Sequence, residues 1–252
     1  MGDADGNAMT SLAENLEQLQ AEIGRACSSA GRARAEVELM AVSKTYPAAT
    51  LAEAAALGLA LFGENRVQEF AAKAHELEPL RNDAPVHPIH VHLIGHLQSN
   101  KALRAVELFD AVDSVDTLRL AERLNEAAAR CGKRLPVLIE VKLSPEESKA
   151  GLAPESDEAA RLLERLPDLA HLEARGLMTI APFGVPEDET RACFRSLRAW
   201  RERWSAAYPR LAFDVLSMGM SGDFPLAIEE GATRIRIGTA LFGRRAPLAG
   251  PA

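Results

Sequence analysis

Residues 38–47 read Glu-Leu-Met-Ala-Val-Ser-Lys-Thr-Tyr-Pro, and this stretch decides how the rest of the chain is interpreted. Leu39 to Val42 is a short apolar run that follows a charged segment, and Pro47 ends the pattern. The length and the flanking residues predict a buried β-strand. Lys44 stands directly after this strand. A lysine there is most often an exposed surface residue, but a lysine amine shielded from water can form a Schiff base with a carbonyl group.

Further apolar runs of similar length follow along the chain, each bounded by glycine, proline or polar residues. Together with the first run they predict eight strands: Leu39–Val42, Leu59–Phe62, Ile89–Ile94, Ala111–Ser114, Pro136–Lys142, Leu172–Met178, Phe213–Ser217 and Thr233–Ile237. The segments between them are predicted to be helices: Thr50 to Gly58, Arg66–Leu77, a helix ending near Leu108, Asp116 or Thr117 to Gly132, Pro154–Leu166, Glu187–Ala207 and Asp223–Glu230.

Several helix starts carry a capping signal. Ser11 with Glu14 and Thr50 with Glu53 each have the spacing of a capping box, and Asn65 is expected to cap the helix after it. The helix that begins after Ser11 has one apolar stripe and precedes the first strand. It is therefore additional to the alternating strand–helix units.

Strict alternation of strands and helices predicts a parallel sheet, and eight such units in a chain of this length predict a closed (β/α)8 barrel of the TIM type. An open, doubly wound sheet is the main alternative, although no Gly-x-Gly-x-x-Gly follows any predicted strand. No linker marks a second domain. We expect a disordered N-terminus over residues 1–10, one barrel domain over 11–247 and a loose tail over 248–252.

Composition narrows the class of protein. Of 252 residues, 29 are Lys or Arg and 36 are Asp or Glu, which gives a net charge of −7. This acidic balance argues against nucleic acid as a partner. The cysteines at 27, 131 and 193 form no C-x-x-C pattern, no apolar run is long enough to span a membrane, and no signal peptide is evident. We expect a soluble cytoplasmic protein.

In a closed barrel, functional groups lie at the C-terminal ends of the strands. The polar and glycine-rich residues that follow the predicted strands are therefore expected to converge on one mouth. They are Lys44, Asn65, Gln98, Ser99, Asn100, Asp113, Ser114, Lys142, Met178, residues 217–221, Gly238 and Thr239.

The loops after the last two strands have the composition of a phosphate site. Residues 217–222 read Ser-Met-Gly-Met-Ser-Gly, and Gly238-Thr239 follows the eighth strand. Glycine lets backbone N–H groups approach an anion, although either loop alone is more often an ordinary turn. Barrel closure makes the eighth strand a neighbour of the first, so a phosphate there would lie beside Lys44. A phosphate next to a Schiff-base lysine indicates pyridoxal 5′-phosphate (PLP).

Alternation along the eighth strand separates two arginines from two isoleucines. Arg234 and Arg236 share one face, and Ile235 and Ile237 share the other. Arg236, nearest the strand end, is expected to point to the mouth, where it would keep a pyridine nitrogen unprotonated. Arg234 is the more probable of the two to form a buried structural salt bridge.

His90 and His92 form an H-x-H pattern on the third strand. Such a pair can bind zinc, but the further ligands that a zinc site needs are not evident. We expect no metal site. Glu146 and Glu147 are expected to belong to a solvated loop.

These residues resemble the YggS/PROSC family of pyridoxal-phosphate homeostasis proteins. The matching segments span the chain and are together highly specific: Ala41–Thr45, Phe62–Asn65, Val67–Glu69, His92, Ile94–Gly95, Leu97–Lys101, Glu146–Gly151, Gly176–Met178, Ser217–Ser221, Asp223 and Arg236–Gly243. The sequence departs from the family pattern at Arg66, where Tyr is common, at Val91, where Trp is common, and at Lys142, where Asn is common. All three are expected to flank the mouth.

The resemblance implies a single-domain barrel like the N-terminal domain of alanine racemase. It also implies that this chain carries PLP on Lys44 as a Schiff base. It implies phosphate-binding roles for Ser217, Gly219, Gly238 and Thr239, and it places Arg236 opposite the pyridine nitrogen. The candidate cofactor-binding residues are Lys44, Asn65, Met178, Ser217, Met218, Gly219, Ser221, Arg236, Gly238 and Thr239.

Three functions are compatible with these features. The favoured one is PLP carriage in cofactor homeostasis without established turnover, by a monomer that passes PLP to apoenzymes. The few residues after the eighth strand are too short for the second domain that supplies a racemase with its tyrosine, and Tyr46 is the only tyrosine near the mouth. A PLP-dependent racemase or lyase is the alternative, and a cofactor-free aldolase is the third.

Overall fold

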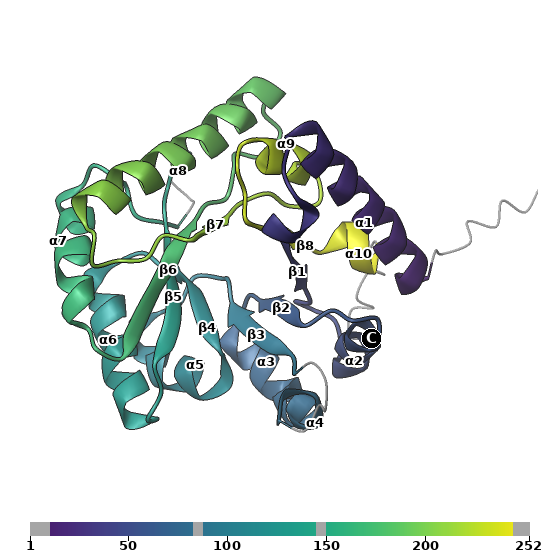
Figure 1. Cartoon of the computed structure of the whole chain (residues 1–252). Coiled ribbons are helices and arrows are strands. Elements are labelled where there is room, and N and C mark those ends of the chain that lie inside the picture. Colours follow the sequence, from purple (N-terminus) through teal and green to yellow (C-terminus); the bar gives the residue numbers. More distant parts are fainter. Residues whose placement is uncertain (1–10, 83–87, 145–149, 244–252) are drawn as a thin grey trace, which may run out of the picture.

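The computed structural model describes residues 11–82, 88–144 and 150–243. Its eight parallel strands form a closed barrel in chain order, with β1 paired to β8, and helices surround the barrel (Figure 1). The predicted (β/α)8 barrel is confirmed, and the open sheet is wrong. The segments 1–10 and 248–252, and the loop with Glu146 and Glu147, lie outside the described residues. The strands are β1 (Glu38–Val42), β2 (Leu61–Glu64), β3 (His90–Leu93), β4 (Ala111–Val115), β5 (Leu135–Glu140), β6 (Leu172–Met178), β7 (Val215–Ser217) and β8 (Arg234–Ile237).

Helices follow the strands in alternation. They are α1 (Leu12–Ser29), α2 (Ala48–Ala56), α3 (Val67–Lys73), α4 (Glu78–Asn82), α5 (Ala102–Leu108), α6 (Leu118–Arg130), α7 (Asp157–Arg165), α8 (Glu187–Ala207), α9 (Phe224–Glu229) and α10 (Thr239–Phe242). Short 3-10 turns lie at Arg34–Glu36, Ala74–Leu77, Ser99–Lys101 and Leu166–Asp168. The bounds of β6 and α8 equal the predicted ones, whereas α10 was not predicted because its four residues carry no periodic pattern.

Three predicted helix starts are wrong. Pro47 is the N-cap of α2, so Thr50 lies inside the first turn and caps nothing. Arg66, rather than Asn65, is the N-cap of α3. The helix predicted from Pro154 begins later because the Ser156 side chain accepts a hydrogen bond from the backbone N–H of Ala159 at 3.2 Å. In each case a neighbouring residue that fits the backbone better fixes the start.

The additional N-terminal helix α1 covers the side of the barrel where β8 meets β1 and packs against α9 and α10 (Figure 1). Its predicted capping box is confirmed, since Ser11 and Glu14 exchange side-chain-to-backbone hydrogen bonds at 2.8 and 3.2 Å. At the other end, the Arg32 guanidinium donates to the carbonyl oxygens of Ile228 and Ala232 at 2.9 and 2.7 Å. These contacts fix α1 over the last strand–helix unit.

Side chains alternate between the two faces of each strand and build two separate cores. Ile235 and Ile237 join the large core between the barrel and its helices, as the β8 pattern predicted. Inside the barrel, Met40 and Val42 of β1 form a small cluster with Leu61 and Ile94. The interior is therefore apolar at this level.

Charged side chains fill the barrel on the N-terminal side of that cluster. The Arg234 guanidinium donates to Glu38 at 2.8 Å and to Asp113 at 3.2 Å, and Asp113 also pairs with His92 at 3.0 Å. We call these four residues the interior layer. Burial by itself would raise the pKa of Asp113, but His92 and Arg234 hold it below its usual value. Arg234 is the buried salt bridge that the sequence predicted, and Asp113 lies in this layer rather than at the mouth.

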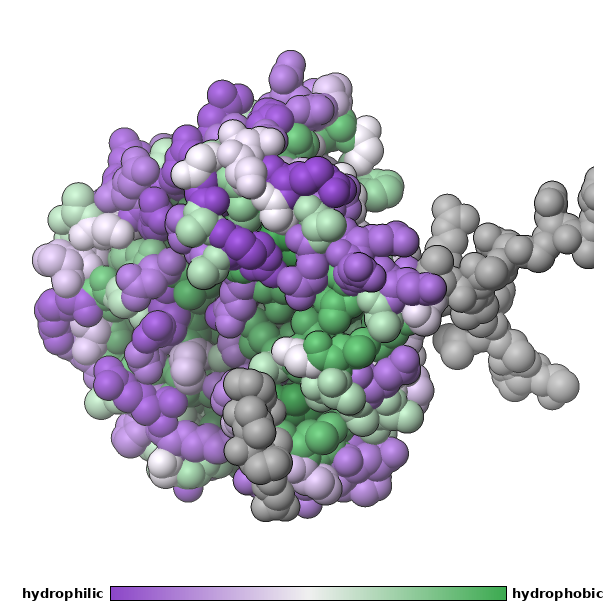
Figure 2. All heavy atoms as spheres, turned by 45° about the vertical axis from the view of Figure 1, so that its right-hand side comes forward, coloured by the Kyte–Doolittle hydropathy of each residue, from purple (hydrophilic) through white to green (hydrophobic). Residues whose placement is uncertain are grey.

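Figure 2 shows one face of the molecule, on which hydrophilic side chains surround an area where apolar side chains are visible. No helix of the described residues is long and apolar enough to cross a membrane.

Candidate functional site

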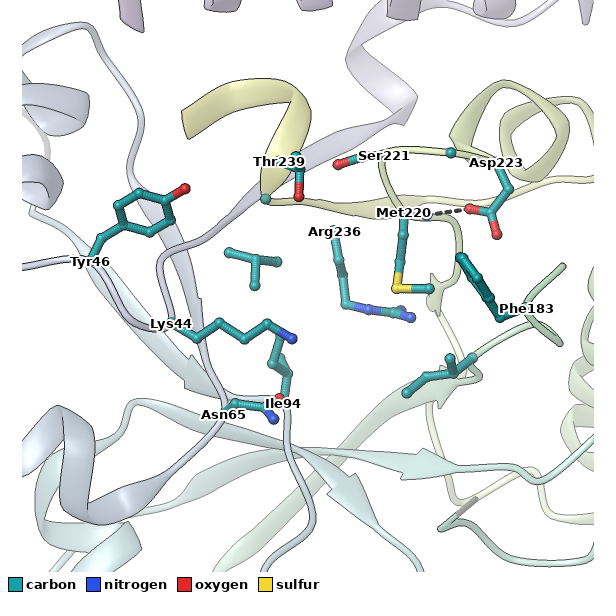
Figure 3. A pocket seen from close by; sticks show the side chains of 14 residues that line it. Lys44, Tyr46, Asn65, Ile94, Phe183, Met220, Ser221, Asp223, Arg236 and Thr239 are labelled. Atoms are coloured by element: carbon teal, nitrogen blue, oxygen red, sulfur yellow. Dashed lines mark hydrogen bonds between the residues drawn. The ribbon is translucent and has the colours of Figure 1, made fainter. Parts of the chain in front are cut away.

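A cavity of about 300 Å3 opens at the C-terminal ends of β1 and β8, and we call it the Lys44 cavity. Several predicted site residues line it together: Lys44, Asn65, Ser221, Arg236, Gly238 and Thr239. Figure 3 shows that the Lys44 side chain extends across the cavity and that Arg236 enters it from β8. The structure thus brings the amine, the arginine and the two glycine-containing loops to one place.

The loop that carries Lys44 is held from below by a buried ion pair. Lys73 of α3 donates hydrogen bonds to the carbonyl oxygens of Ser43 and Tyr46 at 3.2 and 2.7 Å, on either side of Lys44. Its Nζ lies 2.8 Å from Oε1 of Glu64, which also accepts a 2.6 Å hydrogen bond from Ser43. Burial raises the pKa of Glu64 despite these partners. The Lys73–Glu64 pair therefore fixes both ends of the Lys44 loop.

Thr45 adds a second restraint on the same loop. Its φ of 71° lies in the left-handed region, where a β-branched residue is strained. The backbone N–H of Thr45 donates to the carboxylate of Glu69. This hydrogen bond holds the strained turn that directs Lys44 into the cavity.

Arg236 forms the floor of the cavity on the β8 side. Its guanidinium donates to Ser217 Oγ at 2.9 Å and to the carbonyl oxygen of Thr179 at 2.8 Å. Burial lowers the pKa of Arg236, whereas the nearby carboxylates of Asp113 and Glu140 act in the opposite direction. An arginine remains protonated under such conditions, so this side chain presents a fixed positive group and no acid.

The loops after β7 and β8 meet above Arg236. The Ser221 hydroxyl accepts a 3.2 Å hydrogen bond from the backbone N–H of Ala240, which joins the two loops. A Cβ added to Gly222 would meet no atom within 4 Å, and one added to Gly238 would come no closer than 3.5 Å to the chain. The space beside these glycines is open. Together with the Thr239 hydroxyl, it fits an anionic group that binds backbone N–H and hydroxyl donors.

Acidic groups on β4, β5 and the β7 loop surround the mouth. The Asp223 carboxylate accepts a hydrogen bond from the backbone N–H of Met220, and burial raises the pKa of Asp223. Glu140 is buried at the end of β5, where burial and the nearby Asp116 raise its pKa to about 7. Asp116 in turn lies 3.5 Å from His96. The mouth therefore combines the fixed positive charge of Arg236 with carboxyl groups whose pKa values are raised by burial.

Comparison with known proteins agrees with this geometry. Residues 11–246 match the family model described as the alanine racemase N-terminal domain. The pyridoxal phosphate homeostasis protein of Pseudomonas aeruginosa is 44% identical over 94% of this chain and 97% of its own length. The Escherichia coli K12 protein of the same name is 40% identical over 94% of this chain and 98% of its own length.

The chain belongs to the family of pyridoxal phosphate homeostasis proteins. Among solved structures, PipY of Synechococcus elongatus with PLP bound is 43% identical, with a TM-score of 0.80 over 92% of this chain and all of that one. Alanine racemase of Clostridium difficile is 14% identical, with a TM-score of 0.69 over 92% of this chain and 57% of that one, which shows a shared fold.

Four predicted cofactor-binding residues of this homeostasis-family chain do not line the Lys44 cavity as the structure describes it. Met178 and Met218 are completely buried in the barrel wall, and Ser217 lies beneath Arg236 as a hydrogen-bond acceptor. Gly219 has a φ of 91°, and a Cβ there would lie 2.5 Å from the Ala227 side chain. Gly219 thus serves the backbone turn and its packing against α9.

Other expectations about the mouth are wrong. Ser99 and Asn100 line a separate cavity together with Arg119 and Arg123 of α6. They lie there because the chain leaves the mouth after His96 and enters the helical layer through the turn Ser99–Lys101. Val91, expected to flank the mouth, is buried in the core outside the barrel.

The structure also gives the positions of Arg66 and Lys142, the two remaining departures from the family pattern, and of His92 from the histidine pair. Arg66 is exposed at the start of α3, and Lys142 lines a second cavity at the mouth. His92 belongs to the interior layer. In the described part of the chain, no group of three His, Cys, Asp or Glu side chains could hold a metal ion.

Sequence reasoning missed residues at the rim and in the support of the site. Phe183 and Ile180 line the cavity from the loop after β6, with Phe183 93% exposed. The proline-rich composition of that loop gave no signal for them. Lys73 and Glu140 were missed as well, because each has partners in another strand–helix unit, Ser43 for Lys73 and Asp116 for Glu140, and no local pattern links them.

Proposed function

We propose that this protein binds PLP covalently through the amine of Lys44 and takes part in PLP homeostasis without turnover of its own. The observation that carries the proposal is that Lys44, Arg236 and the loops with Gly222 and Gly238 line one cavity. The homologue PipY, 43% identical, has been solved with PLP bound, which supports the same ligand here.

Each group has a role that its position allows. When bound, PLP supplies an aldehyde carbon, and the Lys44 amine takes the place of the aldehyde oxygen with release of one water. Arg236 is a permanent donor, so it favours an unprotonated pyridine nitrogen and weakens the ring as an electron acceptor. Ser221, Thr239 and the backbone beside Gly238 donate hydrogen bonds to the phosphate.

The surroundings of Tyr46 support binding without turnover. Its hydroxyl donates a 3.1 Å hydrogen bond to the carbonyl oxygen of Gly243, and its ring packs against Phe242 with centroids 4.8 Å apart. A phenol held in this way is directed at the backbone rather than at a reacting carbon. We further propose that the protein acts as a cytoplasmic monomer and that PLP-dependent apoenzymes receive its cofactor.

The visible spectrum of the purified protein, followed by intact mass after borohydride reduction, tests the proposal. We expect a visible band and a mass gain of one pyridoxyl phosphate group, both lost in Lys44→Ala. Lys101→Ala is a matched control, because Lys101 lies in the turn after β3 and should leave both signals unchanged. A colourless protein that remains unmodified with added PLP would overturn the proposal.

A racemase or lyase is the second candidate, and Asp223 is the observation that favours it. Asp223 lines the Lys44 cavity and has a raised pKa, so its carboxyl group can exchange a proton there. Incubation with L-alanine and chiral analysis for D-alanine separates the two functions. Turnover that disappears in both Lys44→Ala and Asp223→Asn would establish the enzyme and refute the non-catalytic carrier.

A further inference from the structure

A second cavity of about 220 Å3 adjoins the Lys44 cavity, and we call it the Glu140 cavity. Asn65, Ile94 and Ile180 line both, so these three residues form the boundary between them. Lys44 and Ile94 both line the Lys44 cavity, into which the Lys44 side chain extends (Figure 3). A molecule in the Glu140 cavity would therefore be separated from the cavity that Lys44 enters only by these shared residues.

Glu140 gives this cavity its chemistry. The residue is only 5% exposed, and its Oε2 has no hydrogen-bond partner among the residues that the structure describes. A buried polar atom without a partner is costly, and an ionised carboxylate without one is more costly still. Because Glu140 also lines a cavity, its free oxygen can accept a hydrogen bond from a group bound there.

The neighbouring charges restrict what that group can be. Arg236 faces Glu140 from β8 but already donates to Ser217 and Thr179, and Asp116 adds a second negative charge from the loop after β4. The described residues offer no three-ligand cluster for a metal ion. The ligand must donate a hydrogen bond to Glu140, and it must be compatible with the two negative charges of Glu140 and Asp116. A ligand that carries N–H donors and a positive charge does both.

The walls set the size and character of the rest of the ligand. Ile94, Val141 and Leu143 provide apolar surface beside the carboxylate, which suits a short aliphatic body. Lys142 lies two residues beyond Glu140 on the same strand end, nearer to solvent, and His96 also lines the cavity. A carboxylate on the ligand, as in an α-amino acid, would lie near the Lys142 side chain.

We propose that the Glu140 cavity binds the ammonium group of a small aliphatic amine, with Glu140 as its counter-ion. The site itself is independent of the cofactor, but its significance rests on the proposed function: an amine held there would be placed to compete with Lys44 for the carbonyl group of PLP. A simple amine and an amino acid share this chemistry, and the test separates them.

Ligand-observed NMR titration of the full-length, cofactor-free protein tests the site with n-propylamine, L-alanine and the neutral propan-1-ol at pH 8.5. We expect both amines to bind and propan-1-ol not to bind. Glu140→Gln should weaken amine binding at least tenfold, whereas Glu173→Gln, which changes a half-buried carboxylate on β6 outside the Glu140 cavity, should leave it unchanged. Tighter binding of L-alanine than of n-propylamine would assign the amino acid, and the reverse would assign the simple amine.

A pH titration of the wild-type protein provides a second measurement that needs no variant. Amine affinity should fall as the pH is lowered through about 7, where Glu140 takes up a proton in the surroundings of Asp116, Arg236, His96 and Lys142. Absence of amine binding at pH 8.5, or equal binding in Glu140→Gln, would overturn the proposal and leave a water-filled cavity. Because no PLP is present, this result is independent of whether Lys44 binds the cofactor.

Discussion

The interior layer and the mouth of this barrel hold the same kinds of charged groups but use them differently. In the interior layer, Arg234 contacts both Glu38 and Asp113, and Asp113 also pairs with His92. At the mouth, only two residues along the same strand, Arg236 donates to a hydroxyl and a carbonyl, and the Glu140 carboxylate retains an oxygen without a partner among the described residues. The charges of the interior layer are paired with one another, whereas Glu140 at the mouth keeps an oxygen that a bound group can reach from the Glu140 cavity.

The interior layer should give the largest effect on stability. Arg234→Met removes the cation from two carboxylates, one of which is almost completely buried. Breaking a buried ion pair from one side typically costs about 3–5 kcal/mol, and we expect a loss of that size in the free energy of unfolding, measured in urea. Arg119→Met on the exposed face of α6 is the control. A loss below about 1 kcal/mol would show that the interior layer contributes little.

Glu140→Gln should raise the free energy of unfolding, whereas Arg234→Met should lower it. The pKa of Glu140 is raised to about 7 in the folded protein, from 4.5. Between these pH values the folded state holds a proton that the unfolded state has lost, so wild-type stability falls as the pH rises through this window. The shift corresponds to about 3 kcal/mol. The variant should match the wild type near pH 4 and exceed it by about this amount at pH 8.

Urea unfolding of both proteins at pH 4, 6 and 8 measures this difference. Glu173→Gln again serves as the control, because it changes a carboxylate on β6 that does not lie at the mouth. A constant difference between Glu140→Gln and the wild type across the range would contradict the assignment of a buried, partly unsatisfied carboxyl group at the mouth.

Lys73→Met should have a smaller effect on stability but a direct effect on Lys44. The change leaves the carbonyl oxygens of Ser43 and Tyr46 without this donor, while Glu64 can take up a proton because its pKa is already raised. We expect a loss of about 2 kcal/mol, within the range for hydrogen bonds to charged groups. Attachment of PLP should also be slower, as followed by the visible band.

Lys73→Arg keeps the charge and separates support of the loop from general destabilisation. Partial recovery of the attachment rate in this variant would support positioning of Lys44 by the ion pair. An unchanged rate in Lys73→Met, with stability lowered, would limit Lys73 to a structural role.

The sequence predicted the barrel because the signal for it is local and repeated. Alternation on β8 placed Arg234 and Arg236 inside and the two isoleucines outside. The predicted helix starts at Thr50 and Asn65 failed because the choice among adjacent capping residues depends on small backbone differences. The Lys73–Ser43 contact spans 30 residues of sequence, so no local pattern contains it. Contacts between residues of different strand–helix units were the ones missed.

Thr45→Gly should have the smallest effect, and it tests whether the mouth also stores backbone strain. A non-glycine residue in the left-handed region costs about 1–2 kcal/mol, whereas glycine costs about 0.5–1 kcal/mol through the extra freedom of the unfolded chain. With a φ of 71° at Thr45, we expect Thr45→Gly to be more stable by roughly 1 kcal/mol in urea unfolding. Thr45→Ala retains a Cβ and should stay close to the wild type. A less stable Thr45→Gly would show that the Thr45 backbone stores no strain that glycine relieves. The mouth would then resemble the interior layer in being held by its hydrogen bonds and ion pairs, here the one to Glu69.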